Sequence, residues 1–248
     1  MLLRTALELG VNLLDTAPAY GSSEERLGNL LPGSRQDWLL STKVGEEFDG
    51  KNSRFNYSAQ HARLSLKRSL KRLNTSYLDL VLLHSNGNQE PELLESGAMQ
   101  VLQQAKAEGW VRAVGLSHKT TAGGMAAVTL CDVIMTPFIF SSSEKVADFR
   151  RLLDAAQQNG CGVLLKKVLD AGHAGVSPEG QVSSGQSDTP SAANSNSPQD
   201  TTPAIPTICE RLTEAASLPG VSSLTLGTID PEHLQQNVGV LNALNLFR

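Results

Sequence analysis

The chain has 248 residues, of which 40% are hydrophobic, so it is long enough to form one sizeable hydrophobic core. Its 21 basic and 25 acidic residues give a formal net charge of -4 at pH 7, which excludes the basic surface that nucleic-acid-binding proteins need. No apolar run approaches the roughly 18 residues of a membrane span, so no membrane partner is expected.

The chain opens with an amphipathic helix over residues 1–10, which ends at Gly10. Short apolar runs then alternate with helical patterns. Several of these runs, such as "LDLVLLH", are apolar at nearly every position, which is typical of strands buried on both faces of a parallel sheet. The expected strands are 12–16, 38–43, 78–84, 113–117, 133–137, 162–167 and 223–227.

A helix is expected after each strand, over 22–31, 58–73, 91–109, 120–128, 144–159, 204–217 and 231–244. Ser22 followed by Glu25 predicts a capping box at the start of the helix over 22–31. The helix over 58–73 carries basic residues opposite its apolar stripe, which we interpret as a solvated face rather than a phosphate-binding patch.

The alternation predicts an α/β fold, a parallel sheet with covering helices, and its spacing fits a (β/α)8 barrel formed by a single domain over 1–248. Only seven strands are visible, because the strand that should precede the first helix is absent. The barrel is therefore expected to be incomplete, with two unpaired sheet edges. A fragment, a start assigned too late and a gap filled by oligomerisation remain open as explanations, and the oligomeric state is unknown.

The segment over 177–203 is rich in Ser, Pro, Gln and Asn and nearly free of large apolar residues. Such a composition buries too little apolar surface to offset the entropy of ordering, so it predicts a mobile loop. The loop follows a strand on the face where barrel enzymes carry their active sites, so a lid and an inert insertion are both open, and we favour the insertion.

The three cysteines, Cys131, Cys161 and Cys209, are far apart and lack the spacing of a metal site, so no metal is expected. An odd number of cysteines without a secretory leader favours reduced thiols in a cytoplasmic protein. We expect each of them to be a small buried residue.

Four ionisable side chains stand at the carboxyl ends of three successive predicted strands. Asp15 ends the strand over 12–16 and Tyr20 follows in its loop, Lys43 ends the next strand, and His84 ends the third. Each has an ordinary structural explanation alone, but together they would face one mouth of the barrel, where such enzymes place reactive groups.

These four groups suit proton transfer to a carbonyl. A free tyrosine has a pKa of about 10, and a nearby ammonium lowers that value. A carboxylate can hold the ammonium in place, and a neutral imidazole can orient the carbonyl oxygen. Reduction also needs a hydride, which no side chain supplies, so a nicotinamide cofactor is implied.

The sequence resembles the aldo-keto reductase family through "LLDTAPAYGSSEERLG", "STKVG", "LDLVLLHSN", "GWVRAVGLS" and "LTLGTIDPEHLQQNV". The resemblance implies hydride transfer between NADP(H) and an aldehyde or ketone. It assigns Tyr20 as the general acid/base and Lys43 as its partner, with Asp15 supporting Lys43 and His84 orienting the carbonyl of a small-molecule substrate.

The resemblance also implies a cofactor site. Ser117 matches a residue that bonds the nicotinamide carboxamide, and His118 stands where Asn is common. Lys166 occupies the region where many members stack a tyrosine on the nicotinamide. Thr228 matches a hydroxyl at the 2′-phosphate, Gln236 and Asn237 match adenine contacts, and Gly227 and His233 replace a Lys and an Arg.

Because both of those positive charges are missing, NAD(H) is possible as well as NADP(H). Two functions therefore stay open for this fold. One is a carbonyl reductase, and the other is a catalytically weak or inactive nicotinamide-binding regulatory protein. A barrel with unrelated chemistry is the least favoured reading.

Overall fold

The structure is a computed structural model that describes residues 1–31, 33–141, 143–169 and 207–244, so the predicted loop over 177–203 lies outside the described residues. The helices are α1 (Leu2–Glu8), α2 (Ser23–Leu30), η1 (Arg35–Asp37), α3 (Ala59–Arg72), α4 (Glu90–Leu93), α5 (Gly97–Ala107), α6 (Thr121–Ala127), α7 (Val146–Gln158), α8 (Ile208–Ser217) and α9 (Pro231–Ala243). The strands are β1 (Leu13–Asp15), β2 (Leu39–Val44), β3 (Glu46–Phe48), β4 (Ser53–Phe55), β5 (Leu78–His84), β6 (Val111–Ser117), β7 (Val133–Pro137), β8 (Gly162–Lys166) and β9 (Ser223–Leu224).

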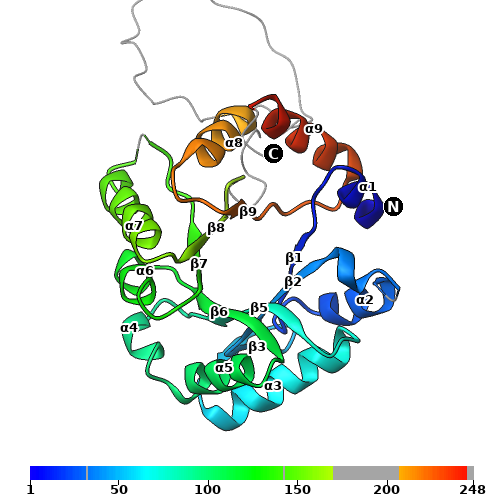
Figure 1. Cartoon of the computed structure of the whole chain (residues 1–248), viewed down its shortest axis with the longest axis vertical. Helices are drawn as coiled ribbons and strands as arrows, with labels where there is room; N and C mark the ends of the chain where they lie inside the picture. Colours follow the sequence, from blue (N-terminus) through cyan, green and yellow to red (C-terminus); the bar gives the residue numbers. More distant parts are fainter. Residues whose placement is uncertain (32, 142, 170–206, 245–248) are drawn as a thin grey trace, which may run out of the picture.

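Seven parallel strands form one curled sheet in the order β1-β2-β5-β6-β7-β8-β9, and helices cover its outer face (Figure 1). Strand β1 pairs only with β2, and β9 pairs only with β8, so within the described residues the two edges do not meet. The sheet is therefore an incomplete (β/α)8 barrel, as the sequence predicts. No helix among the residues described is long and apolar enough to cross a membrane.

Helix α1 packs against helix α9 beside this gap, so the outer layer of helices continues where the sheet does not (Figure 1). The gap in the sheet is consequently covered on the outside by two helices from opposite ends of the chain. The inner side of the gap belongs to a cavity of about 920 Å³.

Alternate residues of each strand face two different apolar clusters. Leu80, Leu82, Met135 and Leu164 pack together inside the barrel, and their immediate neighbours, such as Val81 and Leu83, pack against the helices outside. Because side chains alternate along a strand, the next inward positions at the carboxyl ends are Asp15 of β1, Lys43 of β2, His84 of β5, Ser117 of β6 and Lys166 of β8. The same periodicity that builds the core therefore aims these polar groups into the mouth.

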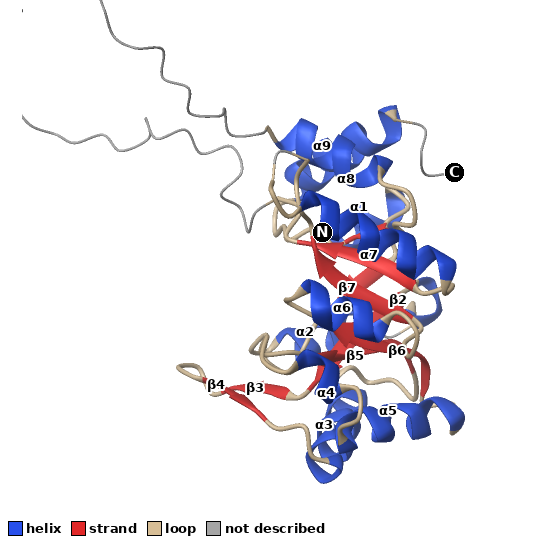
Figure 2. Ribbon diagram, turned by 90° about the vertical axis from the view of Figure 1, so that its left-hand side faces the viewer, coloured by secondary structure: helices blue, strands red, loops and turns tan. Residues whose placement is uncertain are grey.

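An antiparallel hairpin of β3 and β4 departs from the predicted strand–helix alternation. It projects from the body of the protein between β2 and α3 (Figure 2). Its strands, "EEF" and "SRF", have three residues each and no alternating apolar pattern, so the sequence carries no strand signal there.

The expected capping box at helix α2 is wrong. Ser22 is the N-cap residue, but its side chain makes no capping hydrogen bond. Glu25 instead pairs with Arg72 of helix α3 at 2.7 Å, and the buried Glu24 carboxylate accepts a hydrogen bond from Thr42 at 2.8 Å. The Glu25 carboxylate therefore pairs with a residue of α3 instead of capping its own helix. Part of the basic face of α3 is therefore paired rather than solvated.

Two further expectations need correction. The helix predicted over 91–109 is broken into α4 and α5, because the Ser96 side chain accepts a hydrogen bond from Met99 N and caps α5. Cys209 is exposed on helix α8, in contrast to Cys131 and Cys161, which are buried as predicted. A true capping box does occur at the start of α8, between Thr207 and Glu210.

Candidate active site

A buried ion pair joins the ends of the first two sheet strands. Lys43, which is only 1% exposed, donates from Nζ to the Asp15 carboxylate at 2.6 Å and to the Thr16 carbonyl at 2.9 Å. The other carboxylate oxygen of Asp15 accepts a hydrogen bond from the Ser41 hydroxyl at 2.8 Å. The parallel register of β1 and β2 sets Asp15 opposite Ser41, and this pairing brings Asp15 within reach of Lys43.

Tyr20 lies over this pair. The Lys43 ammonium is 4.7 Å from the centroid of the Tyr20 ring, and that ring meets the His84 imidazole edge-on, with centroids 6.3 Å apart. Tyr20 is 47% exposed, so its ring forms the outer surface of the group while Lys43 lies beneath it. The structure therefore brings together all four side chains of the predicted tetrad.

His84 is electrically neutral near pH 7. Burial, and then the positive charges of Lys43, Lys166 and Lys119, lower the pKa of His84 to about 3. The Glu46 carboxylate lies 2.8 Å from His84 Nδ1, but the atoms are not aligned as a hydrogen bond, so the effect of burial dominates. A neutral imidazole can donate only one N–H, which suits a role in orienting a ligand.

Tyr57, which follows the β3–β4 hairpin, holds the backbone at the end of β5. The Tyr57 hydroxyl donates to the His84 carbonyl at 3.0 Å and accepts a hydrogen bond from Asn86 N at 3.1 Å. Gly45, with φ +106°, leads into the hairpin, and a Cβ atom there would lie 2.7 Å from the Tyr57 ring. Glycine at this turn therefore allows the tyrosine to reach the end of β5.

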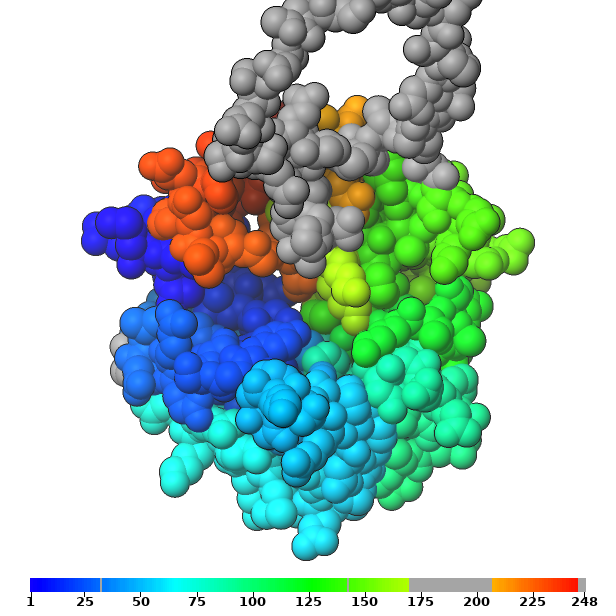
Figure 3. Space-filling view, turned by 180° about the vertical axis from the view of Figure 1, so that it is seen from behind, coloured from blue at the N-terminus to red at the C-terminus, as the bar shows by residue number. Residues whose placement is uncertain are grey.

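The mouth opens into the cavity of about 920 Å³, which is within the usual range for small-molecule sites. Tyr20, His84, Ser117 and Lys166 line one part of it. Residues 9–15 and 222–228 line another, so the cavity extends into the gap between β1 and β9. In Figure 3 a hollow lies between the blue N-terminal segments and the orange C-terminal ones.

Lys166 and Ser117, which both line this cavity, contact each other over the end of β7. Lys166 Nζ donates to Ser117 Oγ at 2.9 Å. Burial, and then the charges of Lys43 and Lys167, lower the pKa of Lys166 to about 7, although Glu90 acts in the opposite direction. The group that stands where the family resemblance places a stacked aromatic ring is therefore an amine that is easily deprotonated.

His118 is placed differently from its neighbour Ser117. It is buried behind the mouth, where Nδ1 contacts the Thr120 carbonyl at 2.9 Å and the ring packs on Gly124, and it is not among the residues that line the cavity. Burial lowers its pKa to about 4. Its Nε2 has no hydrogen-bond partner among the described residues.

The expected phosphate site at the start of helix α9 carries negative rather than positive charge. Gly227 and Thr228 line the cavity, and the Thr228 hydroxyl accepts a hydrogen bond from Asp230 N at 3.1 Å. Asp230 caps the helix through Glu232 N at 2.8 Å. His233 is exposed and lies 4.0 Å from the Asp230 carboxylate.

The two expected adenine contacts lie one turn further along α9. Gln236 is exposed, and Asn237 is buried against the body of the protein. Neither of them lines the cavity. Their role as adenine contacts therefore stays a prediction.

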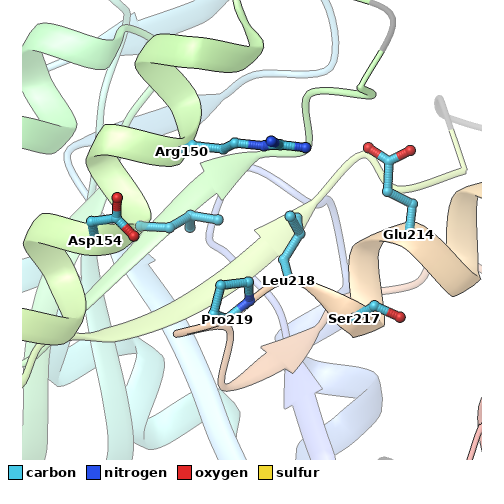
Figure 4. A pocket seen from close by; sticks show the side chains of 7 residues that line it. Arg150, Asp154, Glu214, Ser217, Leu218 and Pro219 are labelled. Atoms are coloured by element: carbon cyan, nitrogen blue, oxygen red, sulfur yellow. The ribbon is translucent and has the colours of Figure 1, made fainter.

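A second, smaller cavity of about 380 Å³ lies between helices α7 and α8. Figure 4 shows Arg150 and Asp154 entering it from α7, and Glu214 and Ser217 from α8. It contains none of the tetrad side chains. Within the described part of the chain, no group of three or more His, Cys, Asp or Glu residues could hold a metal ion.

Sequence reasoning missed Glu46 and Tyr57, both of which contact His84. The adjacent acidic pair in "KVGEEF" is the only local sign of Glu46, and its significance depends on the fold-back of the hairpin. Tyr57 has no signal of its own, because its hydroxyl reaches a backbone atom 27 residues away.

Comparison with known proteins gives one consistent result. The model of the Aldo/keto reductase family matches residues 1–246. The chain is 27% identical to the uncharacterized oxidoreductase YqkF of Bacillus subtilis, over 99% of this chain and 82% of that protein.

Solved structures agree. PA4992 of Pseudomonas aeruginosa, which carries an aldo-keto reductase name, has a TM-score of 0.78 and 38% identity, over 98% of this chain and 82% of its own. An aldo-keto reductase of Klebsiella pneumoniae in complex with NADPH has a TM-score of 0.69 and 22% identity, over 97% of this chain and 78% of its own, and shares the fold.

Proposed function

Because the chain belongs to the aldo/keto reductase family, we propose that it is an NADP(H)-dependent oxidoreductase that reduces an aldehyde or ketone, with Tyr20 as the proton donor. The observation that carries this proposal is the position of the Tyr20 ring over the buried Lys43 ammonium and against the His84 imidazole. A cavity wide enough for a carbonyl compound and a nicotinamide ring opens directly beside them.

Each member of the tetrad has a distinct role in the proposed reaction. Tyr20 gives its hydroxyl proton to the carbonyl oxygen. Lys43 stabilises the negative charge that develops on the phenol oxygen, and Asp15 holds Lys43 in position at 2.6 Å. His84, which is neutral, orients the carbonyl oxygen towards Tyr20.

The cofactor would bind along the residues that line the opposite side of the cavity. When bound, the reduced nicotinamide supplies the hydride that the carbonyl carbon receives. Ser117 offers a hydroxyl for the carboxamide. The start of helix α9 offers backbone N–H groups to phosphate oxygens near Gly227 and Thr228. The NADPH complex of the Klebsiella pneumoniae protein supports the choice of cofactor.

Preference between the two cofactors is proposed to be weak. The segment over 227–237 contains no Lys or Arg, and Asp230 and Glu232 place carboxylates at the start of α9. A 2′-phosphate therefore meets no fixed positive charge there, so we expect NADH to serve as a second cofactor.

A second candidate function is a nicotinamide-binding regulatory protein with little turnover. The open edges of β1 and β9 and the lack of positive charge at the phosphate site favour it, since both would weaken the catalytic complex rather than abolish binding. His118, Lys166, Gln236 and Asn237 stay candidate cofactor contacts under either function.

The test uses the purified full chain with NADPH and NADH. Calorimetric titration measures binding, and the loss of reduced-nicotinamide absorbance with aliphatic, aromatic and dicarbonyl aldehydes measures turnover. Turnover with at least one aldehyde supports the reductase. Binding without turnover on any of them supports the regulatory protein, and neither binding nor turnover would contradict both.

A further inference from the structure

Lys166 lines the cavity from the last inward position of a sheet strand. It ends β8, and Pro137 of the neighbouring strand β7 is its register partner. Lys166 lines the same cavity as Tyr20 and His84, so a carbonyl compound held by the tetrad would share one compartment with this lysine.

The surroundings of Lys166 do not stabilise an ammonium. Its one hydrogen bond within the described residues is to the Ser117 hydroxyl at 2.9 Å, and no described carboxylate lies within ion-pair distance. Lys43, which is more deeply buried than Lys166, has the Asp15 carboxylate at 2.6 Å. Lys43 is therefore paired with a negative charge, whereas Lys166 is paired with a neutral hydroxyl.

The charged groups that face Lys166 come from several elements. Lys43 on β2, Lys119 after β6 and the adjacent Lys167 all disfavour its protonation, and Glu90 on α4 favours it. Together with burial they leave the pKa of Lys166 at about 7, so about half of the amine is neutral at pH 7. A neutral primary amine in a desolvated pocket is a nucleophile towards carbonyl carbon.

We propose that Lys166 is a second carbonyl-reactive group, which forms a reversible imine with small aldehydes in the cofactor-free protein. The Nζ lone pair adds to the aldehyde carbon, and the resulting carbinolamine loses its hydroxyl group as water to give the C=N bond. No electron is transferred and no co-reactant is consumed, so water returns the free aldehyde and the free amine.

This inference needs neither hydride transfer nor the tetrad, although it uses the same cavity as the proposed function. Ser117, the proposed carboxamide contact, is the hydrogen-bond partner of Lys166. An imine at Lys166 would therefore compete with the nicotinamide, and aldehydes at high concentration would inhibit by delaying cofactor binding.

The experiment traps the imine in the full chain. The protein without cofactor is incubated at pH 7 with propanal and sodium cyanoborohydride, which reduces an imine to a stable propyl amine. Intact mass then counts the adducts, and peptide mapping locates them. Lys67, which is exposed on α3 far from the cavity, is the internal reference in the same sample.

We expect Lys166 to be modified roughly 100-fold faster than Lys67 at pH 7, because a pKa of about 7 leaves about half of the Lys166 amine neutral, while limited access removes part of that gain. The Lys166 rate should level off above about pH 7. Modification of Lys166 no faster than Lys67 in the wild-type protein would overturn the proposal, whether or not any Lys166 variant folds.

Repeating the trapping experiment with NADPH distinguishes imine formation at Lys166 from the proposed placement of the cofactor. Saturating NADPH should slow modification of Lys166 at least tenfold and leave Lys67 unchanged. If Lys166 is modified rapidly but NADPH does not protect it, the imine stands and the placement of the cofactor is wrong. In Lys166→Met the fast adduct should disappear while the circular-dichroism spectrum is retained.

Discussion

The Nδ1 atom of His84 lies 2.8 Å from the Oε2 atom of Glu46, so the hairpin after strand β2 brings a carboxylate to the imidazole at the end of β5. Glu46 does not line the cavity, and it touches His84 rather than any ligand position. We therefore regard it as a positioning residue, which limits how the ring can turn.

Removal of the Glu46 carboxylate should allow the His84 ring to adopt more than one orientation. Glu46→Ala should lower kcat/KM about tenfold, because His84 would no longer hold one orientation towards the carbonyl. Glu46→Gln should restore most of the activity, since the amide has the same shape and retains an oxygen facing Nδ1. Steady-state kinetics on the two variants measures the effect.

The neighbouring glutamate provides the control. Glu47 lies on the same hairpin, but its carboxylate pairs with Arg68 of helix α3. Glu47→Ala should leave kcat/KM within about twofold of the wild type even if the melting temperature falls, because the Glu47 carboxylate makes no contact with the His84 imidazole. If Glu47→Ala and Glu46→Ala lower activity equally, the hairpin matters for stability and not for the imidazole.

Tyr20→Phe should abolish the proton donor without disturbing the fold. We expect kcat to fall by about 10² to 10⁴, the usual contribution of a positioned acid, while the Kd for NADPH stays unchanged. The Tyr20 hydroxyl makes no hydrogen bond within the described residues, so its loss should not alter the melting temperature. Turnover measured with the best aldehyde, together with calorimetry, tests this.

Tyr77→Phe is the matched control, because Tyr77 lies at the amino-terminal end of the sheet between the guanidinium groups of Arg35 and Arg112. It should retain full activity. Unchanged turnover in Tyr20→Phe would remove Tyr20 from the mechanism, whatever the result for Tyr77.

The Asp15–Lys43 pair should contribute to both stability and rate. Asp15→Asn leaves a buried ammonium without its counter-charge, so we expect a loss of about 3 kcal/mol in the free energy of unfolding and a fall in kcat. Adding Lys43→Met removes the unpaired charge, so the double variant should be more stable than Asp15→Asn and still inactive. Urea unfolding and steady-state kinetics give the two values. A double variant less stable than the single one would show that Lys43 is not the source of the penalty.

The sequence predicts the large-scale order well because the buried strands are apolar at nearly every position. Strands β5 and β7 begin and end where the pattern places them, and the inward positions at the strand ends follow from the same alternation. That is why the sequence alone places Asp15, Lys43 and His84 together. Strand β9 is shorter than the predicted 223–227, since its edge has no second partner among the described residues.

What the sequence could not predict depends on contacts between distant segments. Glu25 has the spacing of a capping residue, but the fold brings Arg72 to it. Glu46 and Tyr57 act on His84 only because the β3–β4 hairpin returns the chain to the end of β2, beside β5. The low pKa of Lys166 likewise arises from burial and from lysines on other elements, so no local pattern marks it as unusual.

The start of helix α9 predicts how cofactor preference can be changed. His233→Arg places a permanent positive charge beside the proposed 2′-phosphate site, so we expect the Kd for NADPH to fall about tenfold. NADH lacks the 2′-phosphate and serves as the control, with an unchanged Kd. Calorimetric titration with both cofactors measures the change. An equal fall in the Kd for NADH would show that the new arginine does not act on the 2′-phosphate.

Lys166 should make stability depend on pH in a defined direction. The pKa of Lys166 is about 7 in the folded protein and ordinarily about 10.4 in an unfolded chain. The folded state therefore binds fewer protons, and the cost that this imposes on folding is complete below about pH 7, shrinks as pH rises and vanishes above about 10.4.

Lys166→Met removes this cost. We expect it to raise the free energy of unfolding by about 1–2 kcal/mol near pH ~6.5, after allowance for solvent at the cavity mouth, and by much less near pH ~9.5. Urea unfolding at both pH values measures the difference, with Lys67→Met at an exposed position of helix α3 as the control. An equal gain at both pH values would show that the substituted methionine side chain improves packing only, and that Lys166 is protonated as an ordinary lysine is.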